Sequence, residues 1–309
     1  MSQVAVPASG KKACGPATVP GRIVRAVVAV VLAAGVIFGG WHLVRAITRQ
    51  SVTTSYSMRV GGLTRTWEQI TPVAALPASA PVIVVLSGIN APVSSEIARD
   101  DLVPYANADK AELVYPAGYQ ESWNAGGCCG KAAAAHVDDV AFLKALAARV
   151  DPGHRRPLYV VGYSNGGRLA YRMACDDPGV FDETAIVKAD PLVGCTVTDP
   201  QTVLQVASLD DTAVPYQPGD KGTETPAATV QVARLRGADG CRATPVTSHP
   251  GRTLTLTQWD DCVAGTRVGF AVYSSGGHGF PSVTSTQPAA AAVIWSFFTD
   301  AKTVAPVPS

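Results

Sequence analysis

The sequence predicts an α/β fold in which helices cover both faces of a mostly parallel sheet. Short apolar runs, such as 81–86 and 158–161, alternate along the chain with segments that carry apolar residues at helical spacing, such as 137–150. Strands that alternate with helices are typical of a parallel sheet, because each helix connects two strands across one face. About 250 of the 309 residues are available for this fold, so we expect one domain without repeats or a long linker.

The expected elements can be placed in order along the chain. Two short runs separated by Gly61-Gly62 predict a hairpin at the start. Further apolar runs predict strands, and periodic segments that end at residues such as Asp151-Pro152-Gly153 predict helices. The expected strands are 57–60, 64–70, 81–86, 112–115, 158–161, 184–187, 203–207, 254–258 and 268–273. The expected helices are 97–108, which Pro104 interrupts, 137–150, 167–175, 227–235 and 289–298.

Composition narrows the class of protein. The formal net charge is +1 and only 16% of residues are charged, which gives no sign of a nucleic-acid partner or an acidic tail. A hydrophobic fraction of 47% is enough for a large core. Seven cysteines are many for a cytosolic protein, so we expect an oxidising compartment.

The N-terminal region has the pattern of a membrane anchor. Residues 1–25 are polar and small, and residues 26–44 then contain no Asp, Glu, Lys or Arg. About 19 apolar residues are just enough for a membrane-spanning helix. The alternative is a signal peptide that is cleaved for secretion, but its apolar core would be shorter and a small-x-small cleavage site would follow. We therefore expect a cytoplasmic segment at 1–25, a transmembrane signal anchor at 26–44, a linker at 45–56, the α/β domain at 57–300 and a flexible tail at 301–309.

Cysteine positions indicate the orientation of this anchor. Cys14 precedes the apolar segment, and the other six cysteines follow it. An even number of cysteines beyond the membrane fits three disulfides outside and one free thiol inside. We expect an extracytoplasmic domain that contacts the membrane through its N-terminal helix.

The stretch around Ser164 predicts a nucleophile. Ser164 lies in Gly162-Tyr163-Ser164-Asn165-Gly166, between an expected strand and an expected helix. This Gly-x-Ser-x-Gly pattern is that of a nucleophile elbow, where a strand turns sharply into a helix with serine at the apex. Glycine is needed on both sides because the strand and the helix pass too close for a Cβ atom. The Asn165 N–H at the helix start would point toward an oxyanion beside the serine.

A base and an acid follow in the order typical of an α/β-hydrolase. Of the five histidines, His278 alone lies in a glycine-rich loop directly after an expected core strand, where an imidazole can reach Ser164. The strand 203–207 leads to the carboxylates Asp210 and Asp211. The pattern alone does not choose between the two aspartates, but serine, acid, histidine is the expected chain order. A second oxyanion donor is expected from the loop near Gly88-Ile89.

Over roughly residues 57–299, the sequence resembles the secreted esterases related to polyhydroxybutyrate depolymerases, feruloyl esterases and acetyl xylan esterases. The resemblance depends on six motifs, which are Tyr115-Pro116-Ala117-Gly118, Trp123-Asn124-Ala125-Gly126-Gly127-Cys128-Cys129-Gly130, Val137-Asp138-Asp139-Val140-x-Phe142, Gly162-Tyr163-Ser164-Asn165-Gly166-Gly167, Asp211-x-x-Val214-Pro215-Tyr216 and Gly276-Gly277-His278-x-Phe280-Pro281.

The resemblance implies an α/β-hydrolase fold and a role for each site residue. It makes Ser164 the nucleophile, Asp211 the orienting acid and His278 the base. The backbone of Ile89 and Asn165 would form the oxyanion hole, and Trp123 and Phe280 would contact the substrate. The resemblance also implies a disulfide between Cys241 and Cys262. The pairing of Cys128, Cys129, Cys175 and Cys195 is left open.

Two positions depart from the family pattern. Ser87-Gly88 stands where the family usually has His-Gly, at the strand that leads to the oxyanion loop. Phe280 stands where the family has tryptophan, two residues after the base, so the acyl or alcohol pocket is expected to differ in shape.

The sequence therefore predicts an extracytoplasmic serine esterase that hydrolyses polyhydroxyalkanoate-like, feruloyl or acetyl esters through an acyl-enzyme on Ser164. One alternative is an acyltransferase that passes the acyl group to a sugar or lipid alcohol. Another is a catalytically silent scaffold that binds glycan or cell-envelope material, for which Ser87 is the support. The sequence has no metal-ligand spacing and no nucleotide-binding loop, so neither a metal nor another cofactor is expected.

Overall fold

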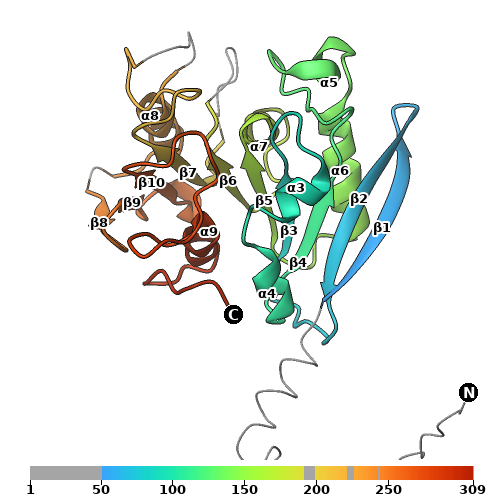
Figure 1. Cartoon of the computed structure of the whole chain (residues 1–309), viewed down its shortest axis with the longest axis horizontal. Coiled ribbons are helices and arrows are strands. Elements are labelled where there is room, and N and C mark those ends of the chain that lie inside the picture. Colours follow the sequence, from blue (N-terminus) through green and yellow to red (C-terminus); the bar gives the residue numbers. More distant parts are fainter. Residues whose placement is uncertain (1–50, 191–198, 221–225, 243, 309) are drawn as a thin grey trace, which may run out of the picture. The chain divides into compact units, whose positions relative to one another are not determined.

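The computed structural model describes residues 51–190, 199–220, 226–242 and 244–308 (Figure 1). The predicted cytoplasmic segment, the membrane anchor at 26–44 and residues 45–50 of the linker lie outside this range. Within it, no helix has the length and apolar character needed to cross a membrane.

The described residues form one ten-stranded sheet that matches the predicted mostly parallel architecture. The strand order is β1-β2-β4-β3-β5-β6-β7-β10-β9-β8. All pairings from β4 to β10 are parallel, and the strands at both edges pair antiparallel. The strands are β1 Ser51–Val60, β2 Leu63–Pro72, β3 Val82–Leu86, β4 Glu112–Pro116, β5 Leu158–Tyr163, β6 Glu183–Val187, β7 Thr202–Ser208, β8 Val246–Ser248, β9 Leu254–Trp259 and β10 Val268–Tyr273.

Helices lie on both faces of this sheet. Neighbouring residues of a strand point to opposite faces, so each face carries its own apolar core. Val85 and Val161 face a core that includes α9, whereas Val84 and Val160 face a core that includes α6 and α7. A third apolar cluster includes residues of α8, β7 and β10; Figure 1 shows where these elements lie. The helices are α3 Val93–Ile97, α4 Val103–Asn107, α5 Gly130–Ala134, α6 Asp139–Val150, α7 Asn165–Asp176, α8 Ala228–Ala238 and α9 Ala290–Phe298, with a short 3₁₀ turn at Val263–Gly265.

The N-terminal linker prediction is wrong from Ser51 onward. Residues 51–56 are the first part of β1, which pairs with β2 along its full length, from Ser51 opposite Pro72 to Val60 opposite Leu63. This part of β1 is mostly exposed, with polar residues and without the apolar alternation that marks a half-buried strand, so its pattern did not reveal it.

Two further predictions need correction. The helix expected at 97–108 is helical only in α4, because α3 ends at Ile97 where that helix was expected to begin. Pro104 lies in the first turn of α4, where proline is tolerated. The tail is not loose over its described residues, because Val304 and Val307 pack against the core although no helix or strand forms there.

Five of the six cysteines predicted to lie outside the membrane are disulfide-bonded in the described residues, four of them in two bridges between described cysteines. Cys241 and Cys262 form the disulfide that the resemblance implied. Cys128 is joined to its neighbour Cys129, a pairing that spacing did not reveal. Cys175 is also disulfide-bonded.

The topology brings four loops together. Strands β3, β5, β7 and β10 all run in the same direction, so their carboxyl ends lie at one edge of the sheet. Ligand and catalytic groups of open α/β sheets lie at this edge. The segments that leave it carry Ser87-Gly88-Ile89, Ser164, Asp210-Asp211 and His278, respectively.

Candidate active site

Ser164 occupies a strained turn between β5 and α7. Its φ of 52° and ψ of −116° lie in a region that side-chain-bearing residues rarely adopt. The turn needs glycine on both sides: a Cβ on Gly162 would collide with the Gly166 carbonyl, and a Cβ on Gly166 would collide with the Leu86 carbonyl. The Ser164 N–H donates to the Val187 carbonyl at 2.9 Å, which ties the turn to β6. This geometry is that of a nucleophile elbow.

Ser164, His278 and Asp211 form one hydrogen-bonded chain. His278 Nε2 lies 2.9 Å from Ser164 Oγ, and His278 Nδ1 lies 3.0 and 3.1 Å from the two Asp211 carboxylate oxygens. With its proton on Nδ1, the imidazole donates to Asp211 and accepts from the serine hydroxyl, the arrangement of a general base. The structure thus brings together the three residues predicted for the triad.

The environment of Asp211 favours its carboxylate form. Burial would raise its pKa, but hydrogen bonds from His278 and from the Val214 and Ala213 amides outweigh burial and lower the pKa below its usual value. A carboxylate that stays ionised can stabilise the imidazolium that forms when His278 takes a proton.

Asp210 has a separate role at the same strand end. Its carboxylate accepts hydrogen bonds from the Gly276 N–H at 3.1 Å and from the Gly277 N–H at 2.8 Å. These amides belong to the loop that carries His278. The structure therefore resolves the choice that the pattern left open: Asp211 contacts the imidazole, and Asp210 holds its loop.

The predicted oxyanion loop lies against the elbow. A Cβ on Gly88 would be 3.6 Å from Ser164 Cβ and 3.0 Å from the Tyr163 ring, so the loop backbone passes directly beside the nucleophile. In the described part of the chain the Ile89 amide has no backbone acceptor. The Asn165 N–H is at the first position of α7, where the helix offers no acceptor. Both predicted donors are therefore available to an oxyanion.

Trp123 is not a substrate contact, contrary to the prediction. It is fully buried, its indole N–H donates to the Ser87 carbonyl at 3.0 Å, and its backbone makes two hydrogen bonds with the Asn165 side chain. Its role is to join the oxyanion loop to the elbow. Phe280 is 7% exposed and packs edge-on against the Tyr163 ring, so it also supports the site from within. The specific Trp-Asn motif marked a structural contact that only the three-dimensional arrangement reveals.

A buried ionic group that the sequence analysis missed supports the same loop. Glu96 in α3 is 1% exposed, and its carboxylate accepts from Arg99 at 2.8 Å and lies near the Gly88 amide. Burial raises the pKa of Glu96, against the lowering effect of Arg99 and the Gly88 amide. The Arg99 guanidinium lies 4.7 Å from the centre of the Tyr163 ring, and the Tyr163 hydroxyl donates to the His278 carbonyl at 2.7 Å. No motif contained Glu96, so no sequence signal marked it. Lys188, considered below, was missed for the same reason.

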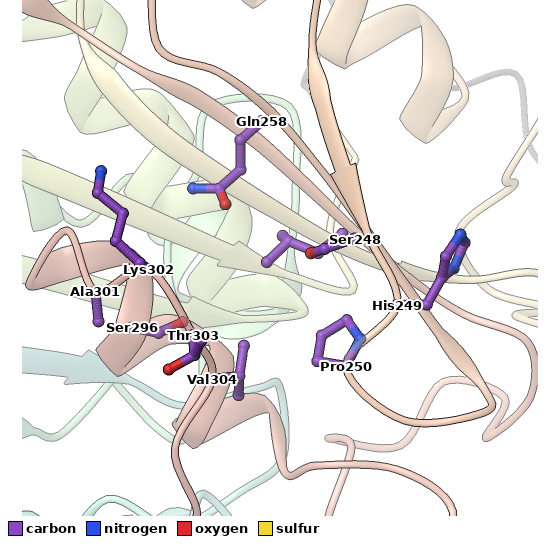
Figure 2. A pocket seen from close by; sticks show the side chains of 10 residues that line it. Ser248, His249, Pro250, Gln258, Ser296, Ala301, Lys302, Thr303 and Val304 are labelled. Atoms are coloured by element: carbon purple, nitrogen blue, oxygen red, sulfur yellow. The ribbon is translucent and has the colours of Figure 1, made fainter.

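The remaining described histidines lie elsewhere. His154 contacts Asp182, and His136 precedes α6, whose first turn is capped by Asp138. His249 lines a surface pocket of about 340 Å³ between β8, β9, α9 and residues 301–304 (Figure 2). No triad residue lines this pocket. Among the described residues no cluster of His, Cys, Asp or Glu is arranged to hold a metal ion.

Known proteins similar to this chain include two named as esterases. "Putative esterase NocK" from Nocardia uniformis subsp. tsuyamanensis is 29% identical over 263 residues, which is 76% of each chain. "Probable feruloyl esterase C" from Aspergillus niger is 24% identical over 165 residues, 52% of this chain and 57% of the relative. A putative dienelactone hydrolase from Klebsiella pneumoniae has a similar fold, with a TM-score of 0.50 and 15% identity over 81% of this chain and 98% of its own. No family model matches the sequence.

Fold and site together define the class of this protein, an α/β-hydrolase. Within that class, the chain is similar to proteins that are named as esterases.

Proposed function

We propose that this protein is an extracytoplasmic serine esterase that works through an acyl-enzyme on Ser164. The observation that carries the proposal is the continuous contact from Asp211 through His278 to Ser164 at the apex of an elbow. A nucleophile, a base and a group that orients the base are the parts that this mechanism needs.

The geometry supports the following sequence of steps. His278 Nε2 takes the proton of Ser164 Oγ as the oxygen attacks the ester carbonyl, and Asp211 stabilises the imidazolium. The Ile89 and Asn165 amides donate to the oxyanion of the tetrahedral intermediate. His278 then gives the proton to the leaving alcohol, which leaves an acyl-enzyme. Water, activated by His278, releases the acid and restores Ser164.

The location outside the cytoplasm is supported by the disulfides. Cys128–Cys129 and Cys241–Cys262 are bridged and Cys175 is disulfide-bonded, and such bonds persist mainly in oxidising compartments. The apolar segment 26–44 would keep the enzyme at the membrane. Secretion after cleavage of this segment is the alternative.

For the acyl group, the candidates are hydroxyalkanoate, feruloyl and acetyl esters. The relative named as a feruloyl esterase favours an aromatic acid. Ile89, which is 38% exposed, adds an apolar side chain next to the expected oxyanion donor. A hydrolysis screen of the full-length chain, with esters that differ only in the acyl group, would rank these candidates.

Replacing the nucleophile tests the proposal. We expect Ser164→Ala to abolish hydrolysis of an activated ester and labelling by a fluorophosphonate, because both need the serine oxygen. Ser55→Ala, on the exposed strand β1, is the matched control and should keep both. Full activity in Ser164→Ala would overturn the mechanism.

The same enzyme preparation separates the two alternatives. An acyltransferase would transfer the acyl group to added sugar or lipid alcohols faster than to water. A silent scaffold would neither hydrolyse the esters nor react with the fluorophosphonate.

A further inference from the structure

Lys188 is a fully buried lysine directly beneath the proposed triad. It follows β6, and its side chain has no exposed surface. Its ammonium donates to Ser208 Oγ, at the end of β7, and to the Gly277 carbonyl at 2.6 Å, in the loop after β10. Lysine is almost never fully buried without partners, so its presence here needs an explanation.

The backbone of Lys188 is constrained as well. Its φ is 51°, in the left-handed region that is uncommon for residues other than glycine, and its N–H donates to the Val206 carbonyl at 2.9 Å. Such strain persists only where surrounding contacts impose it, and it occurs often at functional sites.

The two contacts of the Lys188 ammonium lie close to the acid and to the base of the proposed triad. Ser208 is three residues before Asp211, and Gly277 is directly before His278. One side chain therefore connects the strand end that carries the acid to the loop that carries the base. The acceptors are a hydroxyl and a carbonyl, and among the described residues no carboxylate lies within ion-pair distance of the ammonium.

We propose that Lys188 is a positioning residue for the base. It holds the His278 loop against the end of β7, and its positive charge disfavours protonation of the resting imidazole. This inference rests on the proposed function, since it assigns to His278 the role of a base that must be neutral before it can act.

The surroundings of Lys188 are compatible with its protonated, positively charged form. Burial lowers the pKa of Lys188 to about 8, against the raising effect of the Asp211 and Asp210 carboxylates. The charged and titratable groups around the His278 loop are Asp210 and Asp211 after β7, Lys188 after β6, Tyr163 in β5, and Glu96 and Arg99 from α3 and the turn after it. Lys188 and Arg99 are the cations of this set, and Arg99 is paired with Glu96.

Lys188→Met tests the proposal, because methionine keeps the length of the side chain and removes both its charge and its donors. We expect kcat per fluorophosphonate-reactive site to fall at least 10-fold, with KM within 3-fold of wild type. We also expect the acid limb of the kcat/KM profile to move up by at least half a pH unit, because a nearby positive charge no longer opposes imidazolium formation. A merely structural residue would not move this limb. A smaller change in either quantity would overturn the proposal.

Ser208→Ala keeps the test decisive if Lys188→Met does not fold. This variant removes one acceptor of the ammonium but keeps its charge, so we expect kcat to fall 2- to 10-fold with the acid limb unchanged. Ser296→Ala is the matched control, a buried serine in α9 whose hydroxyl contacts only its own helix among the described residues. Equal kcat values for the two serine variants would overturn the proposal.

Failure of the inference can be told apart from failure of the proposed function. A wild-type chain that hydrolyses esters and a Ser164→Ala chain that does not would establish the function by themselves. An inactive wild-type chain would overturn both, whereas an active one with a normal Lys188→Met profile would overturn only the role of Lys188.

Discussion

Asp210 and Asp211 are adjacent at the end of β7, and their side chains point to different partners. Asp211 contacts the imidazole of His278, and Asp210 contacts the amides of Gly276 and Gly277. The chain turns just after β7, and in this turn only Asp211 of the two meets the imidazole. The two carboxylates allow the orienting role to be measured separately from loop support.

We expect Asp211→Asn to lower kcat at least 100-fold, because an amide does not hold the productive tautomer of His278 or stabilise its cation. In serine proteases the corresponding change costs about 10⁴ in kcat. Asp210→Asn should cost less than 10-fold, since the amide oxygen still accepts from the glycine amides. Measuring kcat of both variants on one activated ester decides the matter. A larger loss for Asp210→Asn would show that the acid is wrongly assigned, although the esterase function would stand.

At the scale of elements, the site depends on α3 as well as on the sheet. This helix has only five residues, yet it places the Glu96 carboxylate near the Gly88 amide of the oxyanion loop. The esterases that the sequence resembles usually have histidine where this chain has Ser87. The Glu96 carboxylate lies near the Gly88 amide, and the Trp123 indole donates to the Ser87 carbonyl.

Glu96→Ala should therefore lower kcat about 10- to 100-fold, with KM changed less. The expected loss is part of the 10²- to 10³-fold that removal of a complete oxyanion donor costs, because the Ile89 amide stays present but is less well placed. Glu96→Gln should lose less, as its carbonyl oxygen still places a partial negative charge near the Gly88 amide.

Glu68→Ala is the control for this pair of variants, a glutamate on β2 whose carboxylate contacts Ser55. Kinetics per fluorophosphonate-reactive site separate catalysis from loss of folded protein. If Glu96→Ala has the kcat of the control, the oxyanion loop does not depend on α3.

At the scale of the whole molecule, the cysteines divide between two sides of the proposed membrane anchor. Cys14 precedes the apolar segment, and the disulfides of the described residues follow it. The proposed orientation places Cys14 in the reducing cytoplasm and the enzyme outside.

In intact cells that express the full chain, a membrane-impermeant thiol reagent should not label Cys14. The same reagent should label it after the cells are permeabilised, and a Cys14→Ser variant should lose that signal. Labelling of Cys14 in intact cells would reverse the proposed orientation while leaving the chemistry of the site unchanged.

Much of the fold was predictable because its signals are local. The apolar runs that became β3, β5 and β10 are bounded by turn residues, and periodic residues marked α6. The first part of β1 and the short helix α3 were not predicted, because exposed polar strands and five-residue helices have weak patterns.

The sequence by itself determined which residues could be nucleophile and base. Ser164 lies in the Gly-x-Ser-x-Gly pattern of a nucleophile elbow, and His278 lies in a glycine-rich loop directly after a strand. The sequence also determined that an acid follows β7, with the resemblance favouring Asp211. Only the tertiary structure decided that Trp123 is buried, that Glu96 lies near the Gly88 amide and that Lys188 joins Ser208 to Gly277. The physical reason is the distance along the chain over which each property is set. Backbone strain depends on neighbouring residues, whereas burial and hydrogen bonds between distant segments depend on how the strands align across the sheet.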